Sequence, residues 1–295
     1  MLISAFVYGV IAGCGTTVVP PASEKNLIFK FHFDSTQVRL NSFGQPASIL
    51  PFGHGALSPK VNQMAVHYIE LMPSRLMQLG DGAVLYKGKE TTLGGANAIL
   101  FDSLKKAGEG EAFFSIPISK VAAGTYDYLR VSLAYQNFDI KFKYVYNGTT
   151  PFYFDGTLAS FVGYNTYIKN YLLKTKTITV NDDKLQGYWG FEIPPVNPYL
   201  PTGYSDSGQA QGTTVVNPIA ATSPIPAGSC VVTGEFGQAF TITGNETNDV
   251  VITVSLSTNK SFEWQEVNAD GKFEPAAGEF VVDMGTRGMI PTFVK

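Results

Sequence analysis

The sequence has little cysteine and little charge. Its 295 residues include only two cysteines, which is too few for a disulfide framework. Charged residues make up 15% of the chain, against about 25% in a typical globular protein, and neither sign forms a long run. A nucleic-acid-binding surface needs a basic stripe that replaces phosphate counterions, so the composition argues against nucleic acid as a partner.

Recognised catalytic motifs are also missing. The chain contains no GxSxG nucleophile elbow, no HExxH zinc motif, no CxxC pair and no glycine pattern of the Walker or Rossmann type. Only three histidines are present to serve as general bases or metal ligands. We therefore expect a protein that is not an enzyme.

What the chain has in abundance is apolar, aromatic, glycine and proline residues. Its hydrophobic share of 44% and aromatic share of 13% are enough to bury a core, which rules out a wholly disordered protein. Thirty glycines and 17 prolines, beside many threonine, valine, tyrosine and phenylalanine residues, indicate strands connected by turns.

Apolar residues alternate with polar ones along much of the chain. In the first such segment Phe29, Phe31 and Phe33 share one face, which is typical of a half-buried antiparallel strand. The pair Asn147-Gly148 predicts a hairpin turn because both residue types tolerate positive φ. A second turn is expected at 181–183, and only 96–106 suggests a short helix or helical loop. Further strands are expected at 65–71, 112–118, 128–135, 141–146, 157–162, 167–174, 177–180, 185–192, 229–236, 239–243, 250–256, 261–266 and 280–284.

A proline-rich segment separates two regions of predicted strands. Residues 194–227 hold seven prolines and show no strand periodicity, so we expect an inter-domain linker or a long surface loop there. Before it, 26–193 is expected to fold as an antiparallel β-sandwich. After it, 228–295 is expected to form a smaller β-domain, or alternatively to supply the remaining strands of the first sheet pair. The predicted fold class is all-β in either case.

The N-terminus carries an apolar run followed by a cysteine. Residues 1–13 (MLISAFVYGVIAG) hold no charged side chain, and they are too few to span a bilayer, which takes roughly 20 residues. A run of this length is typical of the apolar region of a secretory signal peptide. The segment Ile11–Cys14 resembles the lipobox of bacterial lipoproteins. The resemblance implies that Cys14 is lipidated after cleavage and that 14–25 forms a tether.

The alternative interpretation of residues 1–13 is an N-terminal hydrophobic strand next to an incidental cysteine. If Cys14 is acylated, Cys230 is the one thiol that remains. Cys230 lies in the apolar segment SCVVTGEF, which favours a buried, inert side chain over a nucleophile.

Histidines are the candidate ligands for a transition metal. His32 lies opposite the phenylalanine face of the first strand, and His54 lies in the loop PFGHGALSP. In the strand AVHYIEL, a period of two places His67 on the face of Ile69 and Leu71. Neutral imidazole suits copper or zinc. Since no HxH or HxxxH pair occurs, the alternative is one structural histidine and two surface ones.

A second candidate site resembles part of a calcium-binding loop. Oxygen-bearing side chains alternate before a glycine in 266–274 (EVNADGKFE), and Asn268, Asp270 and Glu274 are the candidate ligands of a structural calcium ion. The twelfth position is Ala277 rather than a bidentate glutamate. The alternative is a hairpin in which Asp270-Gly271 makes the turn.

Four segments between residues 26 and 192 resemble a known family. They are NLIFKFHFDSTQVRLN, MAVHYIEL, GTYDYLRVSLAYQ and GYWGFE, and they resemble the MbnP-like copper-binding domain of bacterial exported and lipid-anchored proteins. This resemblance implies a β-sandwich and a copper site. A lipobox followed by a two-part all-β layout also resembles Bacteroidota surface lipoproteins, including fimbrial subunits.

These expectations together describe an exported outer-membrane lipoprotein that faces the periplasm or the cell surface. Its expected function is non-catalytic binding of a ligand or metal ion, with copper as the candidate metal. The alternative is a structural surface subunit that self-associates or docks to an envelope protein through exposed strand edges.

The lipobox resemblance makes a direct prediction about Cys14. The variant Cys14→Ala has no thiol to acylate, so we expect it to leave the membrane fraction, whereas Cys230→Ala stays there. Cell fractionation with fatty-acid labelling measures this difference. Unchanged membrane association of Cys14→Ala would contradict lipidation.

Overall fold

The computed structural model describes residues 24–47, 50–198, 200–210 and 229–295. Within these ranges the regular elements are β-strands and three short 3-10 turns, which confirms the predicted all-β class. None of the described elements is a helix long and apolar enough to cross a membrane. The predicted signal segment 1–13, Cys14 and most of the 14–25 tether lie outside the described residues.

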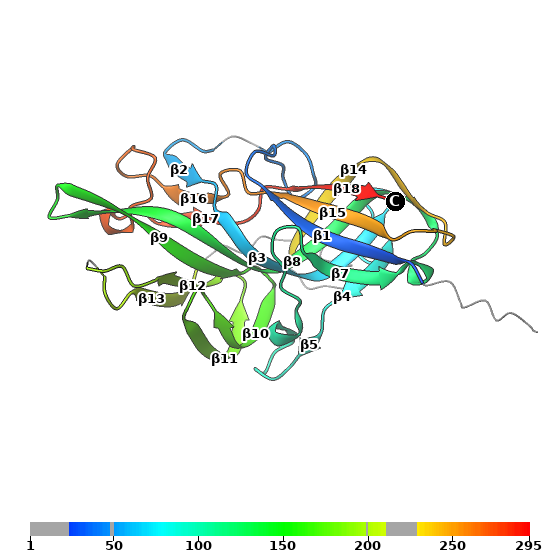
Figure 1. Cartoon of the computed structure of the whole chain (residues 1–295), viewed down its shortest axis with the longest axis horizontal. Helices are drawn as coiled ribbons and strands as arrows, with labels where there is room; N and C mark the ends of the chain where they lie inside the picture. The colour runs from blue at the N-terminus through cyan, green and yellow to red at the C-terminus, as the bar shows by residue number, and fades with distance from the viewer. Residues whose placement is uncertain (1–23, 48–49, 199, 211–228) are drawn as a thin grey trace, which may run out of the picture.

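A seven-stranded sheet forms the middle of the molecule (Figure 1), with the strand order β13-β12-β9-β8-β3-β4 and β14 paired to β8. Its longest strand is β8, with 23 residues, which pairs with β3, β9 and β14. Residues 128–135 and 141–146, expected as two strands, are parts of β8. The strands are β3 (Lys60–Met72), β4 (Ala83–Lys87), β8 (Gly124–Tyr146), β9 (Thr150–Phe161), β12 (Tyr188–Ile193), β13 (Tyr204–Gln209) and β14 (Cys230–Ile242).

Two smaller sheets cover one face of this central sheet. The first has the order β18-β15-β1-β7, and the second has the order β17-β16-β2. Phe29 and Phe31 of β1 are fully buried in the core beneath the first sheet, as their alternation predicts. The strands are β1 (Asn26–Asp34), β2 (His54–Leu57), β7 (Ala112–Pro117), β15 (Val250–Ser257), β16 (Phe262–Gln265), β17 (Val281–Asp283) and β18 (Met289–Val294).

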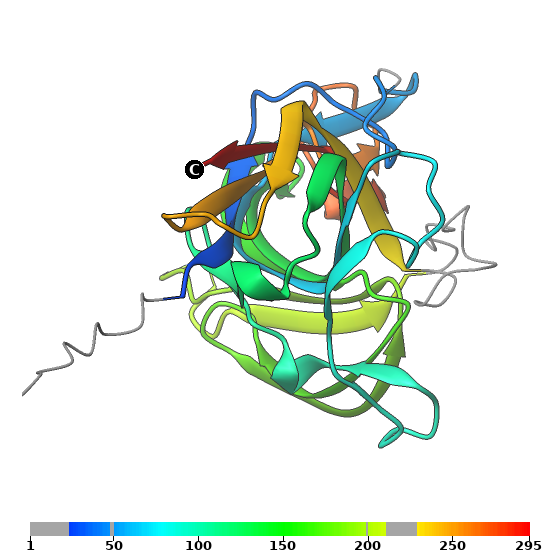
Figure 2. The same ribbon diagram turned by 90° about the vertical axis from the view of Figure 1, so that its right-hand side faces the viewer.

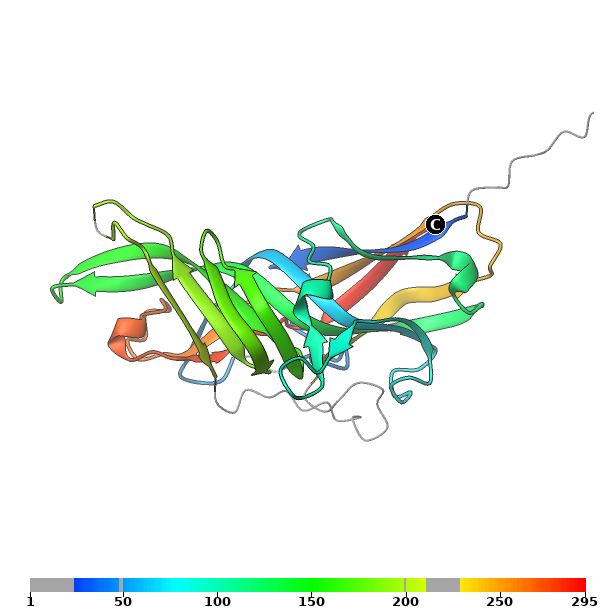
Figure 3. The ribbon, with the colours of Figure 1, turned by 90° about the horizontal axis from the view of Figure 1, so that it is seen from below.

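The opposite face of the central sheet is covered by a fourth sheet, with the order β11-β10-β6-β5. Its strands are β5 (Glu90–Thr91), β6 (Ala98–Leu100), β10 (Asn165–Leu172) and β11 (Thr177–Leu185). Figure 2 shows the resulting layers, and Figure 3 shows β10 and β11 running across the central sheet. Aromatic side chains including Phe161, Tyr171 and Tyr188 fill the space between these two sheets. Both faces of the central sheet are therefore buried.

The strands after residue 228 do not form a sheet of their own. β14 pairs with β8, β15 pairs with β1 in parallel, and β16 pairs with β2. This is the second of the two arrangements considered for 228–295, in which these strands complete the sheets begun by the first region. The described part of the proline-rich segment contains β13, a proline-free strand at the edge of the central sheet.

One local expectation was wrong, and another holds only in part. The turn expected at 181–183 lies inside β11, where Asn181 adopts a φ of 55° beside an irregularity in the β10–β11 pairing. The chain turns instead at Gly187, which has a φ of 90°. The segment 96–106 contains a short strand (β6) rather than a regular helix, and its 3-10 turn at Phe101–Ser103 agrees with the helical loop that was the alternative. The hairpin at Asn147-Gly148 is confirmed, with positive φ at both residues.

A fully buried ion pair fixes one end of the central sheet. Arg130 of β8 donates to the Glu70 carboxylate of β3 at 3.2 Å, and both side chains have no solvent exposure. The pair also binds backbone groups: Arg130 donates to the carbonyls of Arg75 and Met77, and Glu70 accepts from Gly80 and Gly82. The pair therefore holds the loop that connects β3 to β4.

We expect Arg130→Ala to lower the free energy of unfolding by about 3–5 kcal/mol, because it leaves Glu70 as an uncompensated buried charge. The control is Lys141→Ala, which removes an ion pair whose side chains are 73% and 72% exposed. That variant is expected to cost less than about 1 kcal/mol. Urea denaturation measures both, and equal losses in the two variants would refute the structural role of the buried pair.

Candidate functional site

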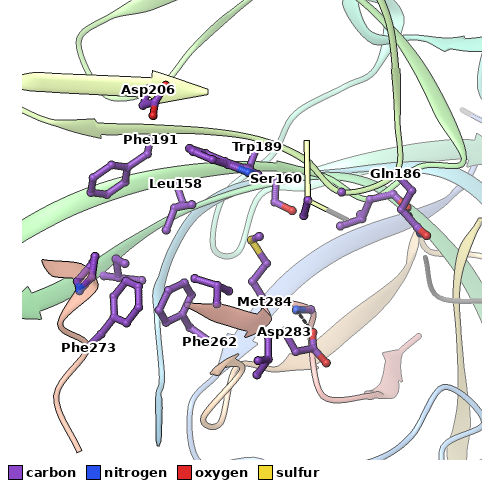
Figure 4. Close-up of a pocket in the computed structure, with 18 of the residues that line it drawn as sticks. Leu158, Ser160, Gln186, Trp189, Phe191, Asp206, Phe262, Phe273, Asp283 and Met284 are labelled. Atoms are coloured by element: carbon purple, nitrogen blue, oxygen red, sulfur yellow. Dashed lines mark hydrogen bonds between the residues drawn. The ribbon is translucent and has the colours of Figure 1, made fainter. Parts of the chain in front are cut away.

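A cavity of about 570 Å³ lies between the central sheet and the β17-β16-β2 sheet (Figure 4). Protein interiors hold few voids larger than a water molecule, whereas ligand pockets typically measure about 300–1,000 Å³. The size of this cavity is therefore that of a binding site for a small molecule.

Strand alternation explains which side chains of the central sheet reach the cavity. In the β12–β9 register Trp189 lies opposite Ser160 and Phe191 lies opposite Leu158, so these four side chains share one face. Tyr188 and Gly190, the intervening residues of β12, face the aromatic core on the other side. The opposite wall comes from β16, β17 and the loops beside them, and it includes Phe262, Phe273, Val281, Asp283 and Met284.

Most of the lining is apolar, and the polar groups in it are few. Ser160 contributes a hydroxyl group and Trp189 an indole to the wall formed by the central sheet. The charged residues are Asp206 on β13 and Asp283 on β17. This composition of apolar walls with a few fixed polar groups is typical of small-molecule sites.

Cys230 also lines the cavity, at the start of β14. Burial, with a further contribution from Asp283, raises the pKa of the Cys230 thiol to about 12. Because the thiolate is the nucleophilic form, this cysteine is unreactive at neutral pH. The residue is half-buried rather than buried, and its raised pKa agrees with the expectation of an inert thiol.

The structure places the three candidate histidines in three different sheets. His32 on β1 contacts Glu109 through Nδ1 at 2.7 Å. His54 is the first residue of β2 rather than part of a loop, and its Nδ1 lies 2.6 Å from Glu263. Among the described residues no three His, Cys, Asp or Glu side chains form a group able to hold a metal ion. As arranged, the histidines do not fit a shared copper site.

His67 lies on the opposite face of β3 from the one expected. Val66 pairs with Leu133 and Tyr68 pairs with Ser132, so His67 is an extra residue in the ladder. This bulge turns the ring away from the core of Ile69 and Leu71 and packs it against Tyr164.

The ring of His67 has no solvent exposure, and its Nε2 lies 3.3 Å from a Glu90 oxygen. Burial lowers the pKa of His67 from 6.5 to about 4, although Glu90 opposes this shift. His67 is thus a neutral histidine of the core at physiological pH.

The predicted calcium ligands do come together, but around a lysine. The Lys143 ammonium lies 2.6 Å from Asp270 and 3.1 Å from Glu274, and Asn268 donates to Glu274. Hydrogen bonds to these carboxylates, with Asp270 first, raise the pKa of Lys143. Calcium takes six to eight oxygen ligands, and here an ammonium group already occupies the space between the two carboxylates. The loop as arranged does not fit calcium.

Sequence reasoning missed the cavity and its residues. One wall of the cavity has a signal in the sequence, because Trp189 and Phe191 flank a glycine in GYWGFE and therefore share one face of a strand. The other wall could not be found, because β16 reaches it by pairing with β2, some 200 residues earlier in the chain. No period or spacing rule predicts a pairing of that separation.

Comparison with known proteins identifies no relative. No family model matches the chain, and no curated protein or solved structure matches it. The fold and the cavity are therefore the basis for a functional proposal.

The lowered pKa of His67 predicts a pH dependence of stability. Between pH 6.5 and 4 the unfolded chain binds a proton at His67 and the folded chain does not, so stability falls as pH falls. His67 is expected to contribute about 3 kcal/mol to the loss over this range, so His67→Gln should lose less stability than wild type by about that amount. Urea denaturation of both proteins across this range measures it, and identical pH profiles would contradict the assignment.

Proposed function

We propose that this chain is a lipid-anchored, non-catalytic binding protein of the cell envelope that holds an apolar ligand in the cavity between its sheets. The cavity carries the proposal, because its volume and its largely apolar lining are those of a small-molecule site. The anchor rests on the lipobox resemblance at Cys14.

The non-catalytic part of the proposal is supported by the chemistry of the lining. The described lining residues include no histidine or lysine, and the Cys230 thiol is held in its protonated form. Because the three histidines lie apart, we place the ligand in the cavity rather than at a copper site.

A structural role on the cell surface is the second proposal, and one feature favours it. The hairpin of β8 and β9 projects from the end of the molecule opposite the start of β1 (Figure 1). Its tyrosines Tyr144, Tyr146 and Tyr153 are each about half exposed. Tyrosine is enriched at protein interfaces, so this tip is suited to contact with another protein.

The binding proposal is tested with 1-N-phenylnaphthylamine, a neutral apolar dye that becomes fluorescent when it leaves water. We expect the purified protein to bind the dye, and Ser160→Phe or Ala210→Phe to weaken binding by about tenfold or more, because either ring fills the cavity. Ser74→Phe is the matched control. Ser74 is exposed and lies outside the lining, so this variant should bind within about twofold of wild type.

Equal unfolding midpoints establish that the variants are folded, and light scattering gives the oligomeric state. A monomer that binds the dye in the cavity supports the binding function. An oligomer that binds no dye, or dye binding that both filled variants retain, would refute it in favour of the structural role.

A further inference from the structure

The charges that line the cavity are all of one sign. The described lining residues include two carboxylates, Asp206 and Asp283, and no lysine, arginine or histidine. Near an unpaired carboxylate in a site with low-dielectric walls, an anionic group is repelled and a cationic group is attracted. This asymmetry argues against fatty acids and other carboxylate ligands.

The two carboxylates are not equivalent. Asp283 is neutralised by Arg287, whose guanidinium lies 2.6 Å from it, and it also accepts from the backbone of Gly285. Asp206 accepts only from the Ser207 backbone and, at 3.3 Å, from the Tyr204 hydroxyl. Among the described residues no cation pairs with Asp206, so its carboxylate is free to pair with a cationic group of a ligand.

Aromatic residues lie on the same strand as the unpaired carboxylate and on the neighbouring strand. In the β12–β13 register Asp206 lies directly opposite Phe191, and the rings of Phe191 and Tyr204 are 6.4 Å apart. Trp189 follows two residues away on the same face of β12, and Figure 4 shows Asp206 above Phe191 and beside Trp189. Faces of aromatic rings attract cations, most strongly organic ammonium groups.

Exposure changes along the cavity. Asp206 and Tyr204 are exposed, whereas Leu158 and Phe262 on the inner walls are buried. A ligand that satisfies both ends has an apolar body and a positively charged group at its outer end.

We propose that the ligand is an amphiphilic organic cation, an apolar chain or ring system with an ammonium group held by Asp206, Trp189, Phe191 and Tyr204. This inference rests on the proposed binding function and adds the chemical class of the ligand.

The test uses competition for the bound dye by three probes with the same decyl chain: decyltrimethylammonium, decyl sulfate and decanol, each below its micellar concentration. We expect the ammonium to displace the dye at about tenfold lower concentration than the sulfate. In Asp206→Asn the ammonium should lose about 3- to 10-fold in affinity, while decanol changes less than about twofold.

Asp81→Asn is the matched control, since it removes the same charge from an exposed position outside the lining. It should keep the wild-type preference for the ammonium. Sulfate that competes as well as ammonium, or an Asp206→Asn loss that is equal for ammonium and decanol, would overturn the cationic ligand and leave the cavity function intact. A protein that binds neither the dye nor decanol would overturn both.

Discussion

The central constraint in this structure is that strand β8 is buried on both faces. Between Leu129 and Ile140 nearly every side chain of β8 is inaccessible to solvent, because the strand pairs with β3, β9 and β14 and is covered from both sides. Exposing either apolar face of such a sheet to water is unfavourable, so the sheet requires a covering layer on each side. The bulge at Ala134, opposite the Ala65–Val66 step, adjusts which residues face each layer.

The way in which one of these faces is covered explains the cavity. Two small sheets share that face, and the chain builds them from strands far apart in sequence, with β15 beside β1 and β16 beside β2. The first packs tightly, with Phe29 and Phe31 in the core. The second has strands of three or four residues, too short to fill the space above β9 and β12. The unfilled space between this second sheet and the central sheet is the aromatic-lined cavity.

Local pattern predicted the long strands but missed shorter ones such as β2, β4 and β18, and the reasons for its failures are physical. Alternation gave the buried faces of β1 and β15, and Asn147-Gly148 gave the hairpin, because these features depend on neighbouring residues alone. Alternation misplaced His67, since one inserted residue reverses the facing of a strand. It also divided the chain at the proline-rich segment, because no local signal shows that β14 joins β8.

For the candidate sites, too, some features were predictable from the sequence and others were not. The chemistry of single residues was predictable, as with the unreactive Cys230 or the acidic loop around Asp270, but their partners were not. Lys143 neutralises the loop that resembles a calcium site from a position more than 120 residues earlier, and no local pattern predicts that contact.

Several buried carboxylates of this chain pair with a cation, as Glu70 does with Arg130 and Glu263 with Arg287. Asp206 is an exposed carboxylate that lines the cavity. It lies on an edge strand opposite Phe191, and no cation of the described chain pairs with it. In a chain with only 15% charged residues, an unpaired carboxylate at an apolar cavity points to a positive charge that the ligand supplies.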